Sequence, residues 1–194
     1  MKFVVLGAGA LGTVIAAYLA RAGKDVALIA RGDRAEHLAK KGVTITGLEE
    51  FTIEVEIIDQ PATLSAADVL VLATKTYDTA AAIDAVRHMT IGSVFSIQNG
   101  VMKNSQLAEA FGEGAVLGAV GMLGGAVQAD GAANYMMANP IIIGELSGQD
   151  SARVEEITAQ LKSAGLPAGA SSHILTEEWS KFVSWLGLSA LSVM

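Results

Sequence analysis

Short apolar runs alternate with longer amphipathic stretches over most of this chain. Four runs have the length and composition of buried strands: residues 2–6, 25–30, 69–73 and 93–97. Five stretches with helical spacing lie between or after them: residues 13–22, 33–41, 79–89, 103–111 and 151–164. The run at 69–73 is apolar throughout, as expected for a central parallel strand that is covered on both faces. The alternation predicts an α/β fold whose strands form a doubly wound, mostly parallel sheet.

Two parts of the chain depart from this alternation. Residues 43–46 and 51–57 alternate apolar and polar positions around a glycine turn, which predicts a small antiparallel excursion. Residues 116–120 are predicted to form a further strand. The glycine- and alanine-rich stretch at 122–139 is predicted to form an excursion that returns at 141–143.

The last segment differs in composition from the rest. A hydroxyl and two acids at Thr176, Glu177 and Glu178 are typical of a helix start. After Lys181 the chain carries no further charge as far as Met194. A helix that is apolar on nearly every side is expected to be buried on every side. We therefore expect this helix to begin a second domain that is missing, cut off or supplied by another copy of the chain.

The turn between the first strand and the first helix carries a nucleotide-binding signature. It reads Gly7-Ala8-Gly9-Ala10-Leu11-Gly12, a G-x-G-x-x-G pattern. In this pattern the first glycine makes the tight turn, the second lets the backbone approach a pyrophosphate, and the third lets the helix pack close to the strand. The anion is expected at the helix N-terminus, where free N–H groups and the helix dipole favour negative charge. The alternative is an ordinary tight turn between a strand and a helix.

The end of the second strand indicates which dinucleotide is preferred. A site specific for NAD usually ends this strand with an acid that accepts hydrogen bonds from the ribose hydroxyls. Here Arg31 stands in place of the acid. A guanidinium is suited to pair with a 2′-phosphate, so NADP is favoured over NAD; the alternative is a solvated loop charge. We expect residues 1–170 to form a Rossmann-type NADP-binding domain and residues 171–194 to begin a second domain whose remainder is absent.

Composition narrows the classes of partner. The 194 residues are 52% hydrophobic, enough for a sizeable core. A net charge of -7 without a basic run argues against nucleic acid, and polar breaks in the apolar stretches argue against a membrane span. Without cysteine there are no disulfides and no thiol catalysis, which fits a reducing cytoplasm, and we expect no signal peptide before the first strand. The histidines lack metal-ligand spacing, so no metal is assigned: they are His37, His88 and His173.

Polar or glycine residues follow three of the expected strands, at the edge where open α/β sheets hold their ligands. Lys75, after the strand at 69–73, is suited to a phosphate or a ribose. Asn99, after the strand at 93–97, both donates and accepts, which suits the amide or ribose of a nicotinamide nucleotide. Gly125 lies in a third, glycine-rich turn and is also expected at the cofactor. The alternatives are a solvated charge at Lys75 and an ordinary Asn-Gly turn at Asn99.

Lys181 is the strongest candidate for catalysis. It is the last charge of the chain and lies on the helix that borders the expected second domain. A lysine at a cleft edge can hydrogen-bond a carbonyl oxygen and protonate the alkoxide as hydride arrives, and such general-acid help typically contributes about 10² to 10⁴ in rate. Partial burial would lower its pKa toward the working range. The alternative is a lysine that snorkels at a helix end.

Together these features resemble the ketopantoate reductase family. The resemblance spans almost the whole chain and is carried, in order, by Gly7-Ala8-Gly9-Ala10-Leu11-Gly12, Arg31, Thr74-Lys75, Gln98-Asn99-Gly100 and Trp179-Ser180-Lys181-Phe182. It implies an NADPH-dependent oxidoreductase that reduces a 2-oxo acid, 2-dehydropantoate or a similar one, to the 2-hydroxy acid on the route to pantothenate. It also implies that the glycine loop holds the pyrophosphate, that Arg31 lies near the 2′-phosphate, and that Lys75 and Asn99 lie at the cofactor. Lys181 is then the proton donor to the substrate, and a helical C-terminal domain closes the cleft.

Two departures from the family pattern bear on substrate and activity. Family members carry asparagines four and eight residues after the catalytic lysine, where this chain has Trp185 and Ser189. Both are expected to contact the substrate, which puts ketopantoate itself in doubt. Without the rest of a helical domain, Lys181 is expected to face solvent. The chain alone is then expected to bind NADPH weakly and to turn over slowly or not at all.

Two other classes of function remain open. One is a non-catalytic NADPH-binding module or sensor built on the same domain, or an inactive fragment of a related 2-oxo acid reductase. The other is assembly, because an exposed apolar stripe on the last helix predicts a homo-oligomer such as a dimer. This stripe comprises Trp179, Phe182, Leu186 and Val193.

Overall fold

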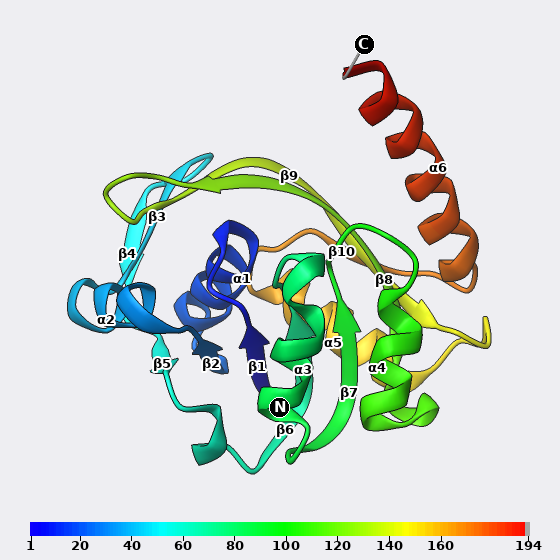
Figure 1. Ribbon diagram of the computed structural model, residues 1–194, viewed down its shortest axis with the longest axis horizontal. Coiled ribbons are helices and arrows are strands. Elements are labelled where there is room, and N and C mark those ends of the chain that lie inside the picture. The colour runs from blue at the N-terminus through cyan, green and yellow to red at the C-terminus, as the bar shows by residue number, and fades with distance from the viewer. Residues whose placement is uncertain (193–194) are drawn as a thin grey trace.

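The computed structural model describes residues 1–192 of this chain and the side chains of residues 1–187 (Figure 1). Over this range the helices are α1 Ala10–Arg21, α2 Gly32–Lys41, α3 Thr79–Val86, α4 Lys103–Phe111, α5 Ala152–Ser163 and α6 Ile174–Ser192. The strands are β1 Lys2–Leu6, β2 Asp25–Ile29, β3 Val43–Gly47, β4 Phe51–Ile53, β5 Glu56–Ile58, β6 Ala66–Leu72, β7 Thr90–Ser96, β8 Leu117–Val127, β9 Ala133–Glu145 and β10 Ala168–Ala170.

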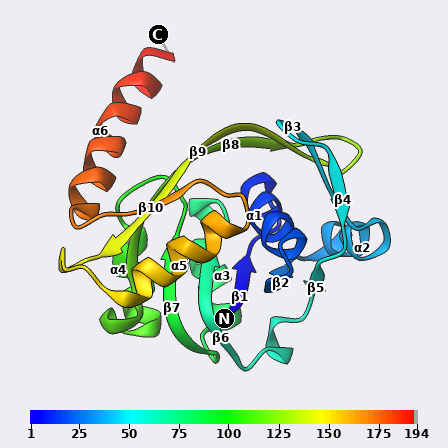
Figure 2. The same ribbon diagram turned by 180° about the vertical axis from the view of Figure 1, so that it is seen from behind.

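A five-stranded parallel sheet forms the centre of the fold. Its strands lie in the order β5-β2-β1-β6-β7, and every neighbouring pair runs parallel. Val4 and Val5 of the central strand have no exposed surface, as the apolar run predicts. Helices α3 and α4 cover one face, and α1 with α5 covers the other (Figures 1 and 2). The doubly wound parallel sheet expected from the sequence is confirmed.

The strand order places a crevice at the carboxyl edge of this sheet. β2 lies on one side of β1 and β6 lies on the other, so the winding direction reverses beside β1. Open α/β sheets bind their ligands where the order reverses in this way. The residues that follow β1, β6 and β7 therefore meet at one edge, and they include the glycine turn at 7–12.

A second sheet packs over α1, and it differs from what the sequence predicted. β8 and β9 form one long antiparallel hairpin, in which Leu117 lies opposite Glu145 and Val127 lies opposite Ala133. β3, β4 and β10 extend the same sheet. The stretch at 122–139 is therefore mostly strand in this hairpin, and 116–120 does not add a full strand to the parallel sheet.

The glycines that kept the sequence from predicting this hairpin are required by its local structure. The ladder between β8 and β9 changes register between Gly124 and Gly125. A Cβ at Gly125 would lie 2.8 Å from the carbonyl oxygen of Asn134, which is closer than side chains tolerate. The close approach of the two strands thus requires glycine, even though glycine weakens the usual signal of a strand.

The prediction of an antiparallel excursion at residues 43–46 and 51–57 is confirmed only in part. β3 and β4 pair antiparallel, with Val43 opposite Ile53. The rest of the segment expected at 51–57 breaks after Ile53. β5 instead joins the parallel sheet beside β2, with Ile57 opposite Leu28.

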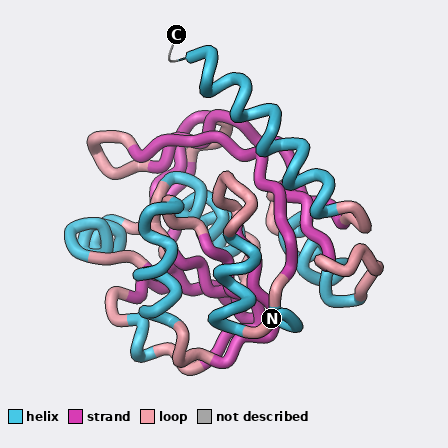
Figure 3. Tube along the Cα trace, turned by 45° about the vertical axis from the view of Figure 1, so that its right-hand side comes forward, coloured by secondary structure: helices cyan, strands magenta, loops and turns pink. Residues whose placement is uncertain are grey.

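Helix α6 projects from the body of the molecule along most of its length (Figure 3). It begins at Ile174, two residues before the expected start, so Glu178 falls in its second turn. Ile174 and Glu178 are buried against the rest of the fold, whereas Trp179 and Leu186 are exposed. Phe182 is half-buried, contrary to its place in the expected exposed stripe. Val193, the last member of that stripe, lies outside the described residues.

Candidate functional site

The glycine turn is built so that each of its three glycines has a distinct environment. Gly7 has φ +116°, and a Cβ there would lie 2.8 Å from the side chain of Thr74. A Cβ at Gly12 would lie 2.0 Å from the carbonyl oxygen of Gly7, so this glycine allows α1 to pack against the turn. Gly9 is different, because nothing lies within 4 Å of the Cβ position. Its backbone faces open space at the start of α1.

A cleft of about 710 Å³ lies over this turn at the carboxyl edge of the parallel sheet. It brings together most of the residues that the sequence nominated. These are Gly7, Ala8, Gly9, Ala10, Leu11, Arg31, Lys75, Asn99, Gly125, Lys181 and Trp185. Gly12 does not line the cleft, because it is packed beneath the turn. The side chain of Ser189 lies outside the described residues.

Two arginines at the start of α2 lie at the rim of the cleft and differ in burial and in their contacts. Arg31 precedes the first residue of the helix and is exposed. Arg34 is half-buried and was not identified from the sequence. Its guanidinium donates hydrogen bonds to the carbonyl oxygens of Ala8, at 3.0 Å, and Gly131, at 2.5 Å, and to Thr13 Oγ1 at 3.1 Å. Arg34 therefore fastens the glycine turn to the β8–β9 hairpin, whereas Arg31 is exposed at the rim.

The ends of β6 and β7 are joined by a buried amide next to Asn99. Gln98 Nε2 donates to the carbonyl oxygen of Thr74 at 3.0 Å and to Thr79 Oγ1 at 2.8 Å. This contact holds together the two loops that carry Lys75 and Asn99. Lys75 and Asn99 themselves are exposed to the cleft. The sequence placed Gln98 in the right loop but gave no sign of its supporting role.

Lys181 projects from α6 toward the end of the cleft. Its Nζ donates a hydrogen bond to the carbonyl oxygen of Gly121 at 2.5 Å. The side chain is half-buried, so the expectation that it faces solvent is wrong: β8 covers it from one side. Burial lowers the pKa of Lys181, and the positive charge of Lys103 lowers the pKa further. A lysine whose pKa lies below the usual value gives up its proton more readily near neutral pH.

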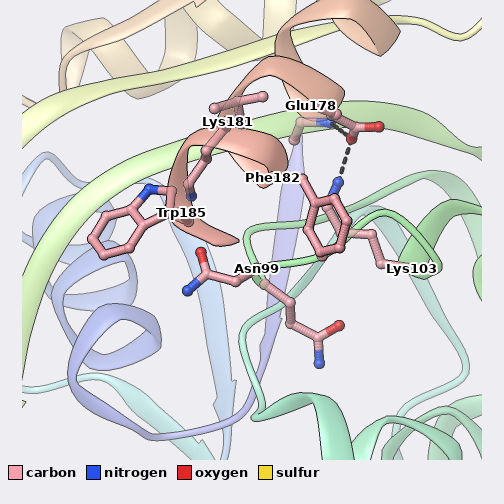
Figure 4. Close-up of a pocket in the computed structure, with 10 residues that line it drawn as sticks. Asn99, Lys103, Glu178, Lys181, Phe182 and Trp185 are labelled. Carbon is pink, nitrogen blue, oxygen red and sulfur yellow. Dashed lines mark hydrogen bonds and ion pairs between the residues drawn. The ribbon is translucent and has the colours of Figure 1, made fainter. Parts of the chain in front are cut away.

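A small pocket opens beside Lys181, between α6 and the loop after β7 (Figure 4). The side chains that line it mix apolar rings with polar and charged groups. Figure 4 shows Asn99, Lys103, Glu178, Lys181, Phe182 and Trp185 around it. Asn99, Lys181 and Trp185 line both this pocket and the larger cleft, so the two spaces adjoin.

The pocket also contains two buried charges that the sequence did not nominate. The Lys103 ammonium and the Glu178 carboxylate form an ion pair between α4 and α6. Glu178 had been expected as an acid in the first turn of the last helix. Because α6 begins earlier, its side chain instead points inward.

Neither a metal cluster nor a membrane span is found in residues 1–192. No group of three or more His, Asp or Glu side chains gathers there as metal ligands do. None of the helices in this range combines the length and the apolar character that crossing a membrane requires.

The parallel sheet, with a glycine turn at its carboxyl edge, defines a Rossmann-type α/β protein. The family model for "Ketopantoate reductase PanE/ApbA" matches residues 3–148. The chain belongs to this family, and the resemblance inferred from its sequence is confirmed.

Individual relatives agree with this assignment. The 2-dehydropantoate 2-reductase of Pyrococcus abyssi is 33% identical over 184 residues, which are 94% of this chain and 60% of that protein. The 2-dehydropantoate 2-reductase of Archaeoglobus fulgidus is 34% identical over 179 residues, or 92% of this chain and 59% of that one. The crystal structure of 2-dehydropantoate 2-reductase from Geobacter metallireducens matches with a TM-score of 0.87 at 26% identity, covering 93% of this chain and 61% of that one. This chain thus spans about three fifths of the length of the curated relatives it matches.

Proposed function

We propose that this chain provides the cofactor-binding part and the proton donor of an NADPH-dependent 2-oxo acid reductase. The substrate is 2-dehydropantoate or a similar 2-oxo acid, the product is the 2-hydroxy acid, and the reaction belongs to the route to pantothenate. The observation that carries the proposal is the position of Lys181, whose half-buried amine lies where the glycine-turn cleft meets the pocket beside Asn99. The family and the names of the relatives support the reaction class.

The residues of the cleft fit a nicotinamide dinucleotide phosphate. A Cβ at Gly9 would project into open space above the turn, which is room that a pyrophosphate needs. The first turn of α1 carries no acid and no side-chain cap, so its N–H groups are available to an anion. We propose that Arg31 binds the 2′-phosphate and that Lys75, Asn99 and Gly125 contact the rest of the molecule. The reduced cofactor, when bound, supplies the hydride.

The chain's own residues account for the proton. Lys181 Nζ holds it beside the carbonyl oxygen of Gly121, which orients the amine. We propose that Nζ donates this proton to the substrate oxygen that becomes the hydroxyl, leaving a neutral amine. Trp185 and Ser189 are proposed to contact the rest of the substrate. Trp185 offers a ring where family members offer an amide, so the substrate is proposed to present an apolar group there.

Three further parts of the proposal concern organisation. We propose that residues 1–170 are the NADP-binding domain and that residues 171–194 begin a helical domain. We also propose a homo-oligomer through the exposed face of α6, where Trp179, Val183 and Leu186 are all more than half exposed; sedimentation at rising concentration tests it. The proposed location is the cytoplasm, since a chain without cysteine needs no oxidising compartment.

Replacing Arg31 tests the choice of cofactor. In Arg31→Ala, we expect the affinity for NADPH to fall by about 10- to 30-fold, because a charge-assisted bond to a phosphate contributes about 1.5–2 kcal/mol. The affinity for NADH should stay unchanged. Fluorescence titration with both cofactors measures this, and Lys162→Ala, which removes an exposed charge on α5, serves as the control. An equal loss for both cofactors would contradict recognition of the 2′-phosphate by Arg31.

A further inference from the structure

A buried ion pair lies directly behind Lys181. The side chains of Lys103 and Glu178 are each 3% exposed, and the ammonium contacts the carboxylate across the junction of α4 and α6 (Figure 4). Two more donors satisfy Glu178: Asn104 Nδ2 at 2.7 Å and the backbone N–H of Ala119 at 2.9 Å. The carboxylate is therefore held by groups from α4 and β8, none of which belongs to its own helix.

Stability alone does not explain this arrangement. Removing two charges from water costs about as much as their attraction returns, and apolar side chains of similar volume often hold two helices together equally well. The buried pair therefore calls for a reason connected with its neighbours. The nearest functional candidate is Lys181, which lies one helical turn from Glu178 and on the same side of α6.

Residues three apart on a helix with opposite charges normally attract each other. Glu178 and Lys181 have this spacing, yet the carboxylate is engaged by Lys103, Asn104 and Ala119 instead. The Lys181 amine is bonded to the Gly121 carbonyl on the cleft side. Lys103 thus takes the carboxylate that would otherwise draw the Lys181 ammonium back toward its own helix.

We propose that Lys103 is a positioning residue for Lys181: by occupying Glu178, it keeps the Lys181 amine directed into the cleft and free of an acidic partner. This inference rests on the proposed function in one respect, because the amine is taken to be the proton donor. The geometry itself does not depend on the substrate.

The charges around Lys181 agree with this role. Lys103 on α4 lowers the pKa of Lys181, in the same direction as burial does. On α6, Glu178 is paired and Glu177 accepts a hydrogen bond from Ser171 Oγ at 2.5 Å. β8 carries no titratable side chain, and of the titratable residues on β9, Tyr135 and Glu145, the carboxylate is bound by Arg153. Lys75 lines the larger cleft but not the small pocket beside Lys181.

Variants of the pair give predictions of opposite sign. In Lys103→Met, Glu178 is left without its cation, so we expect the pKa of Lys181 to rise by about one unit or more. In Glu178→Gln, Lys103 is left without its anion, so we expect the pKa of Lys181 to fall. The double variant Lys103→Met/Glu178→Gln removes both charges and should bring the pKa back toward that of the unmodified chain.

The measurement is a ¹³C NMR titration of the lysine side chains in the full 194-residue chain, with the Lys181 signal assigned by its loss in Lys181→Arg. Thermal unfolding of each variant is recorded in parallel. A crystal structure of Lys103→Met separates position from charge: the account predicts that Lys181 Nζ leaves the Gly121 carbonyl for Glu178, and a Lys181 side chain that keeps its contact with Gly121 would overturn it. An unchanged Lys181 pKa in a folded Lys103→Met or Glu178→Gln variant would overturn the proposal.

The same titration separates this inference from the proposed reaction. The pKa of Lys181 is read without substrate or cofactor, so it does not depend on reductase activity. If the pKa moves as expected but Lys181→Ala leaves the rate of substrate reduction unchanged, the role of Lys103 stands and the assignment of the proton donor falls.

Discussion

Replacing Lys181 by alanine is expected to slow reduction of the 2-oxo acid by about 10² to 10⁴, the usual contribution of a general acid. Affinity for NADPH should change little, because the glycine turn and Arg31 lie elsewhere in the cleft. The half-buried amine of Lys181 lies at the junction of the cleft and the small pocket. Its loss leaves the developing alkoxide without this proton source.

Single-turnover oxidation of NADPH with enzyme in excess measures this effect, because slow turnover of the chain would limit a steady-state assay. Lys162→Ala is the control for loss of a lysine. Lys181→Arg is the more demanding variant, since a guanidinium keeps the charge but holds its proton at all working pH values. We expect it to remain slow. A rate in Lys181→Ala equal to that of the unmodified chain would contradict the assignment of Lys181 as the proton donor, and no NADPH oxidation by the unmodified chain would favour a binding module over a reductase.

The pH dependence of this step follows from the lowered pKa of Lys181. The donor works only while Nζ is protonated, so the single-turnover rate is expected to fall as pH rises through that pKa. The fall should begin below the pH at which an ordinary lysine titrates. A rate that stays constant to the normal range of lysine would contradict the assigned role.

Two alanine substitutions in the glycine turn are expected to affect different properties, Gly12→Ala the stability of the fold and Gly9→Ala the binding of NADPH. Gly12→Ala places a Cβ 2.0 Å from the Gly7 carbonyl oxygen, so the turn or α1 must shift. We expect a loss of about 3 kcal/mol or more in the free energy of unfolding, which lowers the melting temperature by roughly 6–12 °C in a chain of this size. Calorimetry or thermal circular dichroism measures it.

Gly9→Ala tests the same turn for ligand binding instead of stability. Gly9 has φ -70° and ψ -176°, which alanine adopts readily, and its Cβ would meet nothing within 4 Å. The melting temperature should therefore stay within about 4 °C of the unmodified chain. Affinity for NADPH should fall at least about tenfold, because the added methyl group occupies the space of the pyrophosphate. Unchanged affinity in Gly9→Ala would show that the turn is an ordinary βα connection.

Most of the parallel sheet could be predicted from the sequence, because its signals are local. Continuous apolar runs mark β1 and β6, and the helix expected at 103–111 coincides with α4. The hairpin of β8 and β9 could not be predicted in the same way. Its strands approach so closely that Gly125 is required, and glycine carries no strand signal of its own. Its pairing depends on contacts between residues far apart in the chain.

The residues of the candidate site also differ in whether their signals in the sequence are local. The glycine turn and Lys181 were found because their residue types and neighbours in the chain are informative. Lys103 and Glu178 were not found, because their meaning lies in a contact between residues 75 positions apart. Arg34 was missed for the same reason, since Gly131 lies 97 positions away. Glu178, three residues before Lys181, was a local hint of an ion pair near the site. In the sequence it cannot be told from an ordinary acid in the exposed first turn of a helix.

A crystal structure of the chain with NADPH tests the central claim most directly. The account predicts the pyrophosphate over the backbone of residues 7–12, the 2′-phosphate beside Arg31, and the nicotinamide within reach of Asn99 and Lys181. Crystals soaked at saturating NADPH that leave this cleft empty, or that hold the nucleotide elsewhere, would contradict it.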